Sequence, residues 1–274
     1  MARIKRFLEY PTGFIIDTTS NKVLPTIIPT GSLSLDRLLG GGIRTGLVTD
    51  IYGQSGAGKS QLCFSLCVNC AKYLKQNEII VFIDTAGTFR PERVSEMARQ
   101  ERNSNILDKV LLIRAFSTTE QIKSIRKILD INPLLIIIDS ATSLFSYEYT
   151  GAARHLSLMK HLHELAFAAI NFDCAIIITN MIRNVPISRT ISPQHYNNST
   201  KAINATTNSY QQREFMATSV SIYSHMRLRL EIVNPEKSII RASLMHPIRR
   251  DHADFRIMSR GFMDQINQPH TQQE

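Results

Sequence analysis

Residues 47–60 read Leu47-Val48-Thr49-Asp50-Ile51-Tyr52 and then Gly53-Gln54-Ser55-Gly56-Ala57-Gly58-Lys59-Ser60. The first six residues are mostly apolar and β-branched, which predicts a buried strand. The next eight match the pattern G-x-x-x-x-G-K-[ST], and a helical pattern begins at Ser60. Glycines let such a loop approach a phosphate group closely, and the N-terminus of the following helix adds backbone N–H donors. The stretch therefore predicts a phosphate-binding loop between a strand and a helix.

Two side chains at the end of this loop have expected roles in binding a nucleotide. Lys59 is expected to reach the β- and γ-phosphates of a nucleotide, and Ser60 is expected to ligate Mg²⁺. The alternative is a chance glycine-rich turn, which the strand before the loop and the helix after it disfavour. The predicted nucleotide-binding residues of the loop are Gly53, Gln54, Ser55, Gly56, Ala57, Gly58, Lys59 and Ser60.

A second acidic group is expected beside the metal. Asp139 ends the most apolar run of the chain, Leu134 to Ile138, where a charge is otherwise unfavourable. Phosphoryl chemistry uses a carboxylate at a strand end to hold the metal, often through water. Asp139 is also a plausible cap for the next helix, but the upstream loop favours the metal role. Ser60 and Asp139 are the predicted Mg²⁺ residues.

Short apolar runs alternate with helical patterns through the first two thirds of the chain. The runs lack polar alternation, as is typical of strands covered on both faces, and the order predicts a doubly wound, mostly parallel α/β sheet. The predicted strands are Leu47–Tyr52, Ile79–Ile83, Val110–Ile113, Leu134–Asp139 and Ala175–Thr179. The predicted helices are Ser60–Lys75, Pro91–Arg102, Thr119–Leu129 and Ala152–Ile170. Antiparallel C-terminal strands are predicted at Met226–Val233, Ser238–Leu244 and Phe255–Met258.

Composition narrows the class of protein. The chain has 274 residues, 32 Lys and Arg against 23 Asp and Glu, and a formal net charge of +9. A charge of this size favours an anionic partner, the alternative is a solvated basic surface, and the net charge alone does not decide between the two. No apolar run approaches the roughly 18 residues of a membrane span, and the N-terminus does not resemble a secretory signal. The four cysteines are therefore expected to be reduced thiols.

The stretch Arg183–Phe215 fits no predicted element because it is polar and lacks an apolar period. Between positions 174 and 230 there are six basic residues and the single acid Glu214, a net charge of +5. The stretch is either a mobile polar loop or a functional one.

Two cysteine and histidine patterns are interpreted as structural. Cys63, Cys67 and Cys70 match an iron–sulfur spacing, but they lie on one face of the helix that must pack on the sheet. His161 and His163 are two residues apart on a helix, so they do not face one another, and they are interpreted as an ordinary polar face.

Four further motifs resemble the RecA/RadA recombinase family. They are Thr30-Gly31-Ser32-Leu33-Ser34-Leu35-Asp36, Gly87-Thr88-Phe89-Arg90-Pro91-Glu92-Arg93, Ile177-Ile178-Thr179-Asn180 and Gly261-Phe262-Met263-Asp264. The resemblance implies a RecA-like P-loop NTPase core over residues 30–264, with an N-terminal extension at 1–29 and a frayed tail at 265–274. Because the family's N-terminal DNA-binding domain and F-x-x-A docking segment find no match, the chain resembles the core-only archaeal RadB paralogs.

The resemblance also implies site residues. Arg93 would pack on the adenine of ATP. Ala86 stands where the family has the glutamate that activates water, and Met181 stands where it has the glutamine that couples the γ-phosphate to DNA. No catalytic residue is therefore assigned. Residues expected to contact single-stranded DNA are Arg154, Arg183, Arg189, Tyr196, Lys201, Tyr210 and Arg213.

The expected function is that of an ATP- and DNA-binding accessory protein of homologous recombination and DNA repair, with Mg·ATP as cofactor and weak or absent hydrolysis. Its expected partners are single-stranded DNA, a RadA-type recombinase and further subunits. No membrane association is expected, and the expected location is the archaeal cytoplasm. One alternative is an active DNA-dependent ATPase that exchanges strands itself. Another is a signalling or scaffold P-loop ATPase that never contacts DNA.

Overall fold

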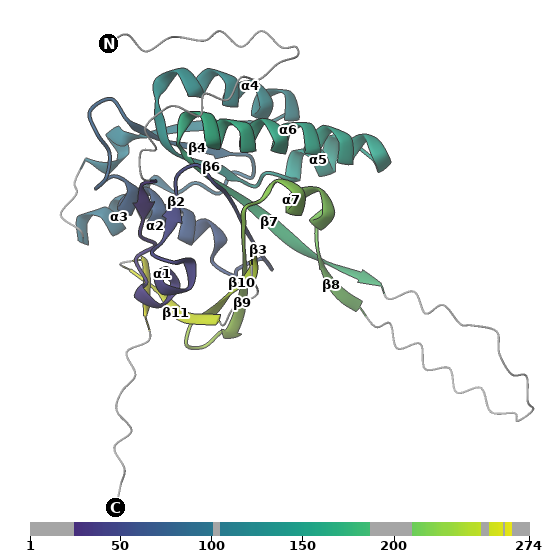
Figure 1. Cartoon of the computed structure of the whole chain (residues 1–274). Helices are drawn as coiled ribbons and strands as arrows, with labels where there is room; N and C mark the ends of the chain where they lie inside the picture. The colour runs from purple at the N-terminus through teal and green to yellow at the C-terminus, as the bar shows by residue number, and fades with distance from the viewer. Residues whose placement is uncertain (1–24, 101–104, 187–209, 248–251, 260, 265–274) are drawn as a thin grey trace, which may run out of the picture.

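The computed structural model describes residues 25–100, 105–186, 210–247, 252–259 and 261–264. Its centre is a ten-stranded sheet in the order β12-β11-β10-β9-β3-β7-β6-β4-β5, with β8 paired to an extension of β7 (Figure 1). Strands β9, β3, β7, β6, β4 and β5 run parallel to their neighbours, and β9 to β12 are antiparallel. This arrangement confirms the predicted doubly wound sheet with antiparallel C-terminal strands.

Most strands of the main sheet follow apolar runs, and β8 with the end of β7 are the exceptions. They are β3 (Val48–Gly53), β4 (Ile79–Asp84), β5 (Val110–Arg114), β6 (Pro133–Asp139), β7 (Ala175–Pro186), β8 (Tyr210–Glu214), β9 (Met226–Asn234), β10 (Ile239–His246), β11 (His252–Met258) and β12 (Gly261–Asp264). A small antiparallel pair, β1 (Ile27–Ile28) and β2 (Ile43–Arg44), precedes them.

Helices cover both faces of the sheet. They are α1 (Leu33–Leu39), α2 (Lys59–Cys70), α3 (Pro91–Gln100), α4 (Thr118–Ile128), α5 (Ser143–Glu148), α6 (Gly151–Phe172) and α7 (Ala217–Tyr223), with 3₁₀ turns at Ile106–Lys109 and Leu129–Ile131. Helices α1 to α3 pack on one face, and α4 to α7 pack on the other (Figure 1). On β6, Leu135 and Ile137 belong to the first core, whereas Ile136 and Ile138 belong to the second. Burial on both faces explains why these strands are continuously apolar.

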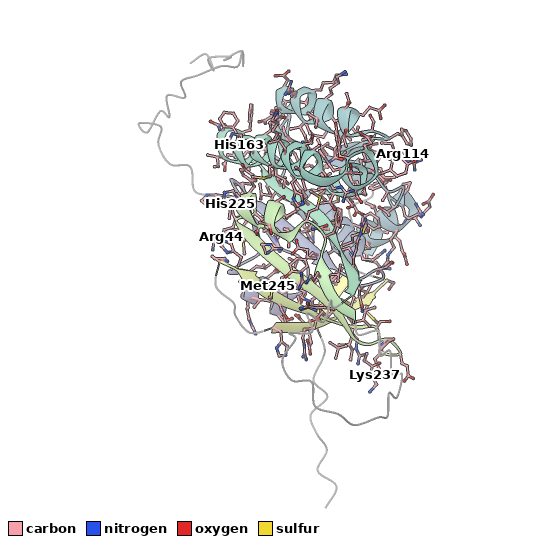
Figure 2. All side chains as sticks on the ribbon, turned by 90° about the vertical axis from the view of Figure 1, so that its right-hand side faces the viewer. Arg44, Arg114, His163, His225, Lys237 and Met245 are labelled. Carbon is pink, nitrogen blue, oxygen red and sulfur yellow. The ribbon has the colours of Figure 1, made fainter. Side chains whose placement is uncertain are left out.

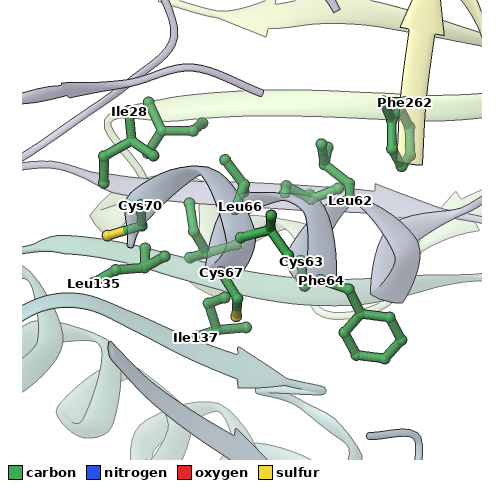
Figure 3. Packing of buried hydrophobic residues seen from close by; sticks show 14 of the residues in the cluster. Ile28, Leu62, Cys63, Phe64, Leu66, Cys67, Cys70, Leu135, Ile137 and Phe262 are labelled. Atoms are coloured by element: carbon green, nitrogen blue, oxygen red, sulfur yellow. The ribbon is translucent and has the colours of Figure 1, made fainter. Parts of the chain in front are cut away.

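Helix α2 lies deep in the first core (Figure 3). Cys63, Cys67 and Cys70 are buried there among Leu62, Leu66 and the β6 side chains, and burial raises the pKa of all three thiols. This burial in the apolar core agrees with the structural interpretation of the three cysteines.

Helix α2 was predicted to reach Lys75 but ends at Cys70. Residues 71–73 form a turn in which the Tyr73 N–H donates to the Cys70 carbonyl at 2.9 Å. Beyond Cys70 the side chains of Lys72, Tyr73 and Lys75 are exposed, so little apolar surface remains to hold a longer helix on the sheet.

The prediction of no regular structure from Arg183 to Phe215 is wrong at both ends. Strand β7 continues to Pro186, and β8 returns antiparallel to it, with Arg183 opposite Arg213. Backbone pairing stabilises this two-stranded stem, which projects from the sheet without an apolar core (Figure 1). An apolar pattern therefore gives no signal for it. Residues 187–209 lie outside the described residues.

The interpretation of His161 as part of a polar face is also wrong. Its side chain is 1% exposed and stacks on Phe145, with ring centroids 5.5 Å apart. His161 shares the buried stripe of α6 with Leu158, Leu162 and Leu165, a spacing of three and four residues that the polar residue type concealed. His163, two residues further on, is exposed at the surface (Figure 2).

Among the described residues, no helix is long and apolar enough to cross a bilayer.

Candidate nucleotide site and nucleic-acid interface

The loop between β3 and α2 has space only for glycine at two positions. A Cβ atom on Gly53 would lie 2.3 Å from the Leu230 carbonyl oxygen. A Cβ on Gly58, whose φ is +87°, would lie 2.8 Å from Ile257 Cδ1. The loop is therefore pressed against β9 and β11, and its backbone conformation needs these glycines.

Lys59 begins α2 and folds back over the loop. Its Nζ donates hydrogen bonds to the carbonyl oxygens of Gly53 and Gln54, each at 2.9 Å. Burial lowers the pKa of the Lys59 ammonium, and the nearby Asp139 carboxylate opposes that shift. The ammonium is thus held at the loop by neutral acceptors, and its contact with a phosphate stays a prediction.

The two predicted Mg²⁺ residues lie together. Ser60 Oγ donates to Asp139 Oδ2 at 2.6 Å, although the residues are 79 positions apart in the chain. Thr88 Oγ1 donates to the same oxygen at 2.8 Å, and Thr179 Oγ1 donates to Asp139 Oδ1. Asp139 is 4% exposed, so a hydroxyl–carboxylate cluster is buried at the carboxyl end of β6. Oxygen donors of this kind suit Mg²⁺.

Thr88 and Thr179 were not predicted as site residues. Each lies inside a family-like motif, the segment 87–93 and the end of the β7 apolar run, so the sequence carried a signal for both. Their hydroxyls orient the Asp139 carboxylate as partners of a metal-binding residue do.

Asp84, at the end of β4, organises the segment that contains Ala86. Its carboxylate accepts the backbone N–H groups of Ala86, Thr88 and Phe89 at 3.2, 3.0 and 3.1 Å. These bonds fix the loop after β4 and leave the Ala86 methyl group exposed. A methyl group cannot accept a proton or orient a water molecule, so position 86 supplies no general base.

Arg93 joins three elements near the loop. Its Nε donates to Gln61 Oε1 at 3.0 Å, and its Nη1 donates to Glu96 Oε2 at 2.6 Å and to the Ser259 carbonyl at 3.0 Å. The guanidinium thus ties α3 to α2 and to the end of β11. Contact between Arg93 and adenine stays a prediction.

Two of the residues predicted to contact DNA converge on one aromatic ring. The guanidinium of Arg183 lies 3.9 Å from the Phe215 ring centroid, and that of Arg154 lies 5.8 Å from it. Arg183 Nη2 also donates to Ser146 Oγ at 2.8 Å, and Arg154 Nε donates to the Tyr149 carbonyl at 2.6 Å. The start of α6 and the root of the β7–β8 stem therefore form one basic surface. Phe215, its centre, was not predicted, since a single aromatic residue in a polar stretch gives little signal.

The other predicted DNA residues divide into two groups. Arg213 lies on β8, where its Nη2 donates to Gln211 Oε1 at 3.0 Å, and Tyr210 begins that strand. Arg189, Tyr196 and Lys201 lie outside the described residues.

A mostly parallel sheet, a glycine-rich loop between β3 and α2 and a carboxylate at the end of β6 define the RecA-like class of P-loop proteins. Within that class, the family model described as Rad51 matches residues 21–264, nearly the whole chain. The chain therefore belongs to the Rad51 family.

Curated relatives agree with this assignment. The chain is 37% identical over 175 residues to the DNA repair and recombination protein RadA of Cenarchaeum symbiosum, covering 59% of this chain and 44% of that protein. It is 38% identical over 177 residues to the RadA of Ignicoccus hospitalis, covering 58% and 54%, and 38% identical over 173 residues to that of Metallosphaera sedula, covering 58% and 53%. The matched region spans about half the length of these relatives.

Proposed function

We propose that this protein is a RadB-like accessory protein of homologous recombination and DNA repair in an archaeal cytoplasm. It binds Mg·ATP and single-stranded DNA, hydrolyses ATP weakly or not at all, and acts beside a RadA-type recombinase, alone or as part of an oligomer. Membership of the Rad51 family and the names of the RadA relatives support the process. The proposed binding of Mg·ATP and DNA and the weak hydrolysis are argued from the phosphate loop, the Asp139 cluster and the surface around Phe215.

The observation that carries the proposal is the 2.6 Å hydrogen bond between Ser60 and Asp139. It brings the hydroxyl at the end of the phosphate loop to the carboxylate at the end of β6, which is the donor pair that an octahedral Mg²⁺ with several water ligands uses. Bound Mg²⁺ would neutralise phosphate charge. In this chain Lys59 would contact the phosphates, Ser60 would bind the metal, and Asp139 would hold a metal-bound water.

Weak hydrolysis follows from two side chains. Ala86 has no group that can orient water, and the Asp84 carboxylate is already bonded to three backbone N–H groups. Met181 cannot hydrogen-bond strongly to a γ-phosphate. A positioned general base contributes about 10²- to 10⁴-fold to a rate, so its loss is expected to leave nucleotide bound for a long time.

Binding of single-stranded DNA is supported by the surface around Phe215. Arg154, Arg183 and Arg213 supply positive charge around the half-buried Phe215 ring, and aromatic rings on a basic surface can stack on unpaired bases. Basic side chains and aromatic rings together favour single strands over a purely electrostatic partner. This surface also argues against the alternative of a scaffold ATPase that never contacts DNA.

Two titrations of the intact chain test the proposal. A labelled oligodeoxythymidylate is titrated in filter-binding experiments with and without Mg·ATP, and Mg·ATP affinity is measured separately. Saturable binding of both, with slow turnover, supports the accessory role. Rapid DNA-stimulated hydrolysis with strand exchange would instead establish the recombinase alternative, and ATP binding without DNA binding would establish the scaffold alternative.

A further inference from the structure

A buried network of polar side chains lies between the phosphate loop and the β7–β8 stem. Its centre is Glu214, the last residue of β8, whose side chain is 6% exposed. Glu214 Oε1 accepts a hydrogen bond from Asn180 Nδ2 at 3.0 Å, and Glu214 Oε2 forms an ion pair with Arg227 Nη2. One carboxylate thus joins β8 to both β7 and β9.

On the β7 side, the network reaches the Asp139 cluster. Asn180 Oδ1 accepts hydrogen bonds from Thr142 Oγ1 and from the Met181 N–H, each at 2.8 Å, and its Nδ2 also donates to the Phe215 carbonyl at 2.7 Å. The amide group is therefore fixed by partners on both sides. The preceding residue, Thr179, holds Asp139, so one end of the network is attached to the predicted Mg²⁺ site.

On the β9 side, the network reaches the strand that leads into the phosphate loop. Arg227 Nε donates to Asp50 Oδ2 at 3.2 Å, and its guanidinium lies 5.0 Å from the Tyr52 ring centroid. Both residues are on β3, which ends at Gly53. Glu214 is therefore connected to the two adjacent strands, β3 and β7, that carry the loop and the residues beside Asp139.

Arg227 has two acidic partners, Glu214 on β8 and Asp50 on β3. Asp50 is fully buried, and burial raises the pKa of its carboxyl group, as does the neighbouring Glu214 charge. Among the described residues, Asp50 Oδ1 has no hydrogen-bond partner. Removal of the Glu214 charge leaves Asp50 on β3 as the acidic partner of Arg227, so Arg227 is expected to shift toward β3 and away from the root of the stem.

We infer that Glu214 is a positioning residue that couples the nucleotide site to the β7–β8 stem, through Asn180 on one side and Arg227 on the other. This inference rests on the proposed function and deepens it. In this chain the apolar Met181 stands between the two sites, and the Glu214 network provides a polar connection beside it. Met181 contributes to this network through its backbone: its N–H donates to Asn180 Oδ1, and its carbonyl accepts the Phe215 N–H at 2.9 Å.

The test compares wild type with Glu214→Gln and measures how strongly Mg·ATP changes the affinity for labelled oligodeoxythymidylate. The readout is the ratio of the oligodeoxythymidylate dissociation constants measured without and with Mg·ATP. In wild type we expect this ratio to be on the order of tenfold. In Glu214→Gln we expect it to fall to about one, while the affinity for Mg·ATP alone is unchanged. Glu214→Asp, which keeps the charge, restores part of the ratio. Glu231→Gln is the matched control, because Glu231 is a β9 glutamate with a 41% exposed side chain that pairs with Arg229 at 2.6 Å.

Amide hydrogen exchange of the wild-type chain tests the same coupling without a substitution. Mg·ATP is expected to slow exchange in residues 210–214 more than in the β9–β10 hairpin. Unchanged exchange in β8, or a full wild-type ratio in folded Glu214→Gln, would overturn the inference. A wild-type chain that does not bind Mg·ATP, or does not bind DNA, would instead overturn the proposed function. Failure of the inference and failure of the proposed function therefore give different results.

Discussion

Lys59 is the residue whose replacement separates nucleotide binding from folding. In Lys59→Ala we expect Mg·ATP affinity to fall by roughly ten- to a hundredfold, because a charge-assisted hydrogen bond contributes about 1.5–3 kcal/mol. The ammonium donates to two loop carbonyls and lies outside the apolar cores, so the thermal midpoint should change little. Nucleotide titration paired with thermal melts checks this, with the exposed Lys75→Ala as control. Unchanged ATP affinity in Lys59→Ala would show that the loop does not bind phosphate.

Ala86 is the residue that limits hydrolysis in this account. Ala86→Glu places a carboxylate on a loop already fixed by Asp84, and we expect the single-turnover rate to rise by about 10²- to 10⁴-fold. Stimulation by DNA should require Met181→Gln as well, because methionine is a poor partner for a phosphate. The measurement is a single-turnover series on wild type, both single variants and the double variant. If Ala86→Glu leaves the rate unchanged, another feature limits turnover.

His161 makes stability depend on pH. Burial lowers its pKa to about 4 from the ordinary 6.5, so the unfolded chain takes up the proton before the folded chain does. The free energy of unfolding is therefore expected to fall as pH drops below about 6.5 and to level off below about 4, by up to about 3 kcal/mol in total. Urea unfolding at pH 7 and 4.5 should show a smaller loss in His161→Gln than in wild type. His163→Gln, an exposed control, should behave as wild type does.

Among the elements, those with a full apolar face were the predictable ones. Strands β3, β4, β6 and helix α6 carry long buried runs, and their bounds agree with prediction to within two residues. Strand β8 and the end of β7 were missed because backbone pairing, not apolar burial, holds them. Helices α1, α5 and α7 were missed because six or seven residues are too few to establish a period.

In the candidate site, too, some features could be predicted from local sequence and others depend on the three-dimensional arrangement. The sequence pattern predicted Lys59, Ser60 and Asp139, because these residue types follow directly from phosphate and Mg²⁺ chemistry. It could not show that Thr88 and Thr179 both bond to Asp139, since that depends on strand order.

The β7–β8 stem is the element to which the DNA prediction belongs. Neutralising Arg183, Arg189, Lys201 and Arg213 together should weaken binding of single strands and flatten its salt dependence, by about 0.7 in the log–log slope for each lost phosphate contact. Replacing Tyr196 and Tyr210 by Ala should cost affinity, about 1–3 kcal/mol per lost stack, with little change of slope. Titrations at several salt concentrations distinguish the two effects. A quadruple variant with the wild-type slope would place the DNA elsewhere.

For the whole molecule, the sheet brings the two predicted binding sites to one edge. The predicted phosphate loop follows β3, the predicted Mg²⁺ residues Ser60 and Asp139 lie at the start of α2 and the end of β6, and the stem extends β7, which lies between β3 and β6. In open α/β sheets ligands bind outside the carboxyl ends of the strands. A nucleotide and a DNA strand are thus expected to occupy neighbouring positions on one rigid core, and Glu214 connects them.

A single-turnover measurement of ATP hydrolysis by the wild-type chain, with and without single-stranded DNA, decides whether the protein is a hydrolysis-poor member of its family. We expect that Mg·ATP binds, that it persists through the reaction time, and that DNA does not speed its loss. Lys59→Ala should retain less nucleotide under the same conditions, as its lower Mg·ATP affinity requires. Brisk hydrolysis that DNA accelerates, and that collapses in Asp84→Asn or Glu92→Gln, would contradict the account and show that another carboxylate performs the role absent at Ala86.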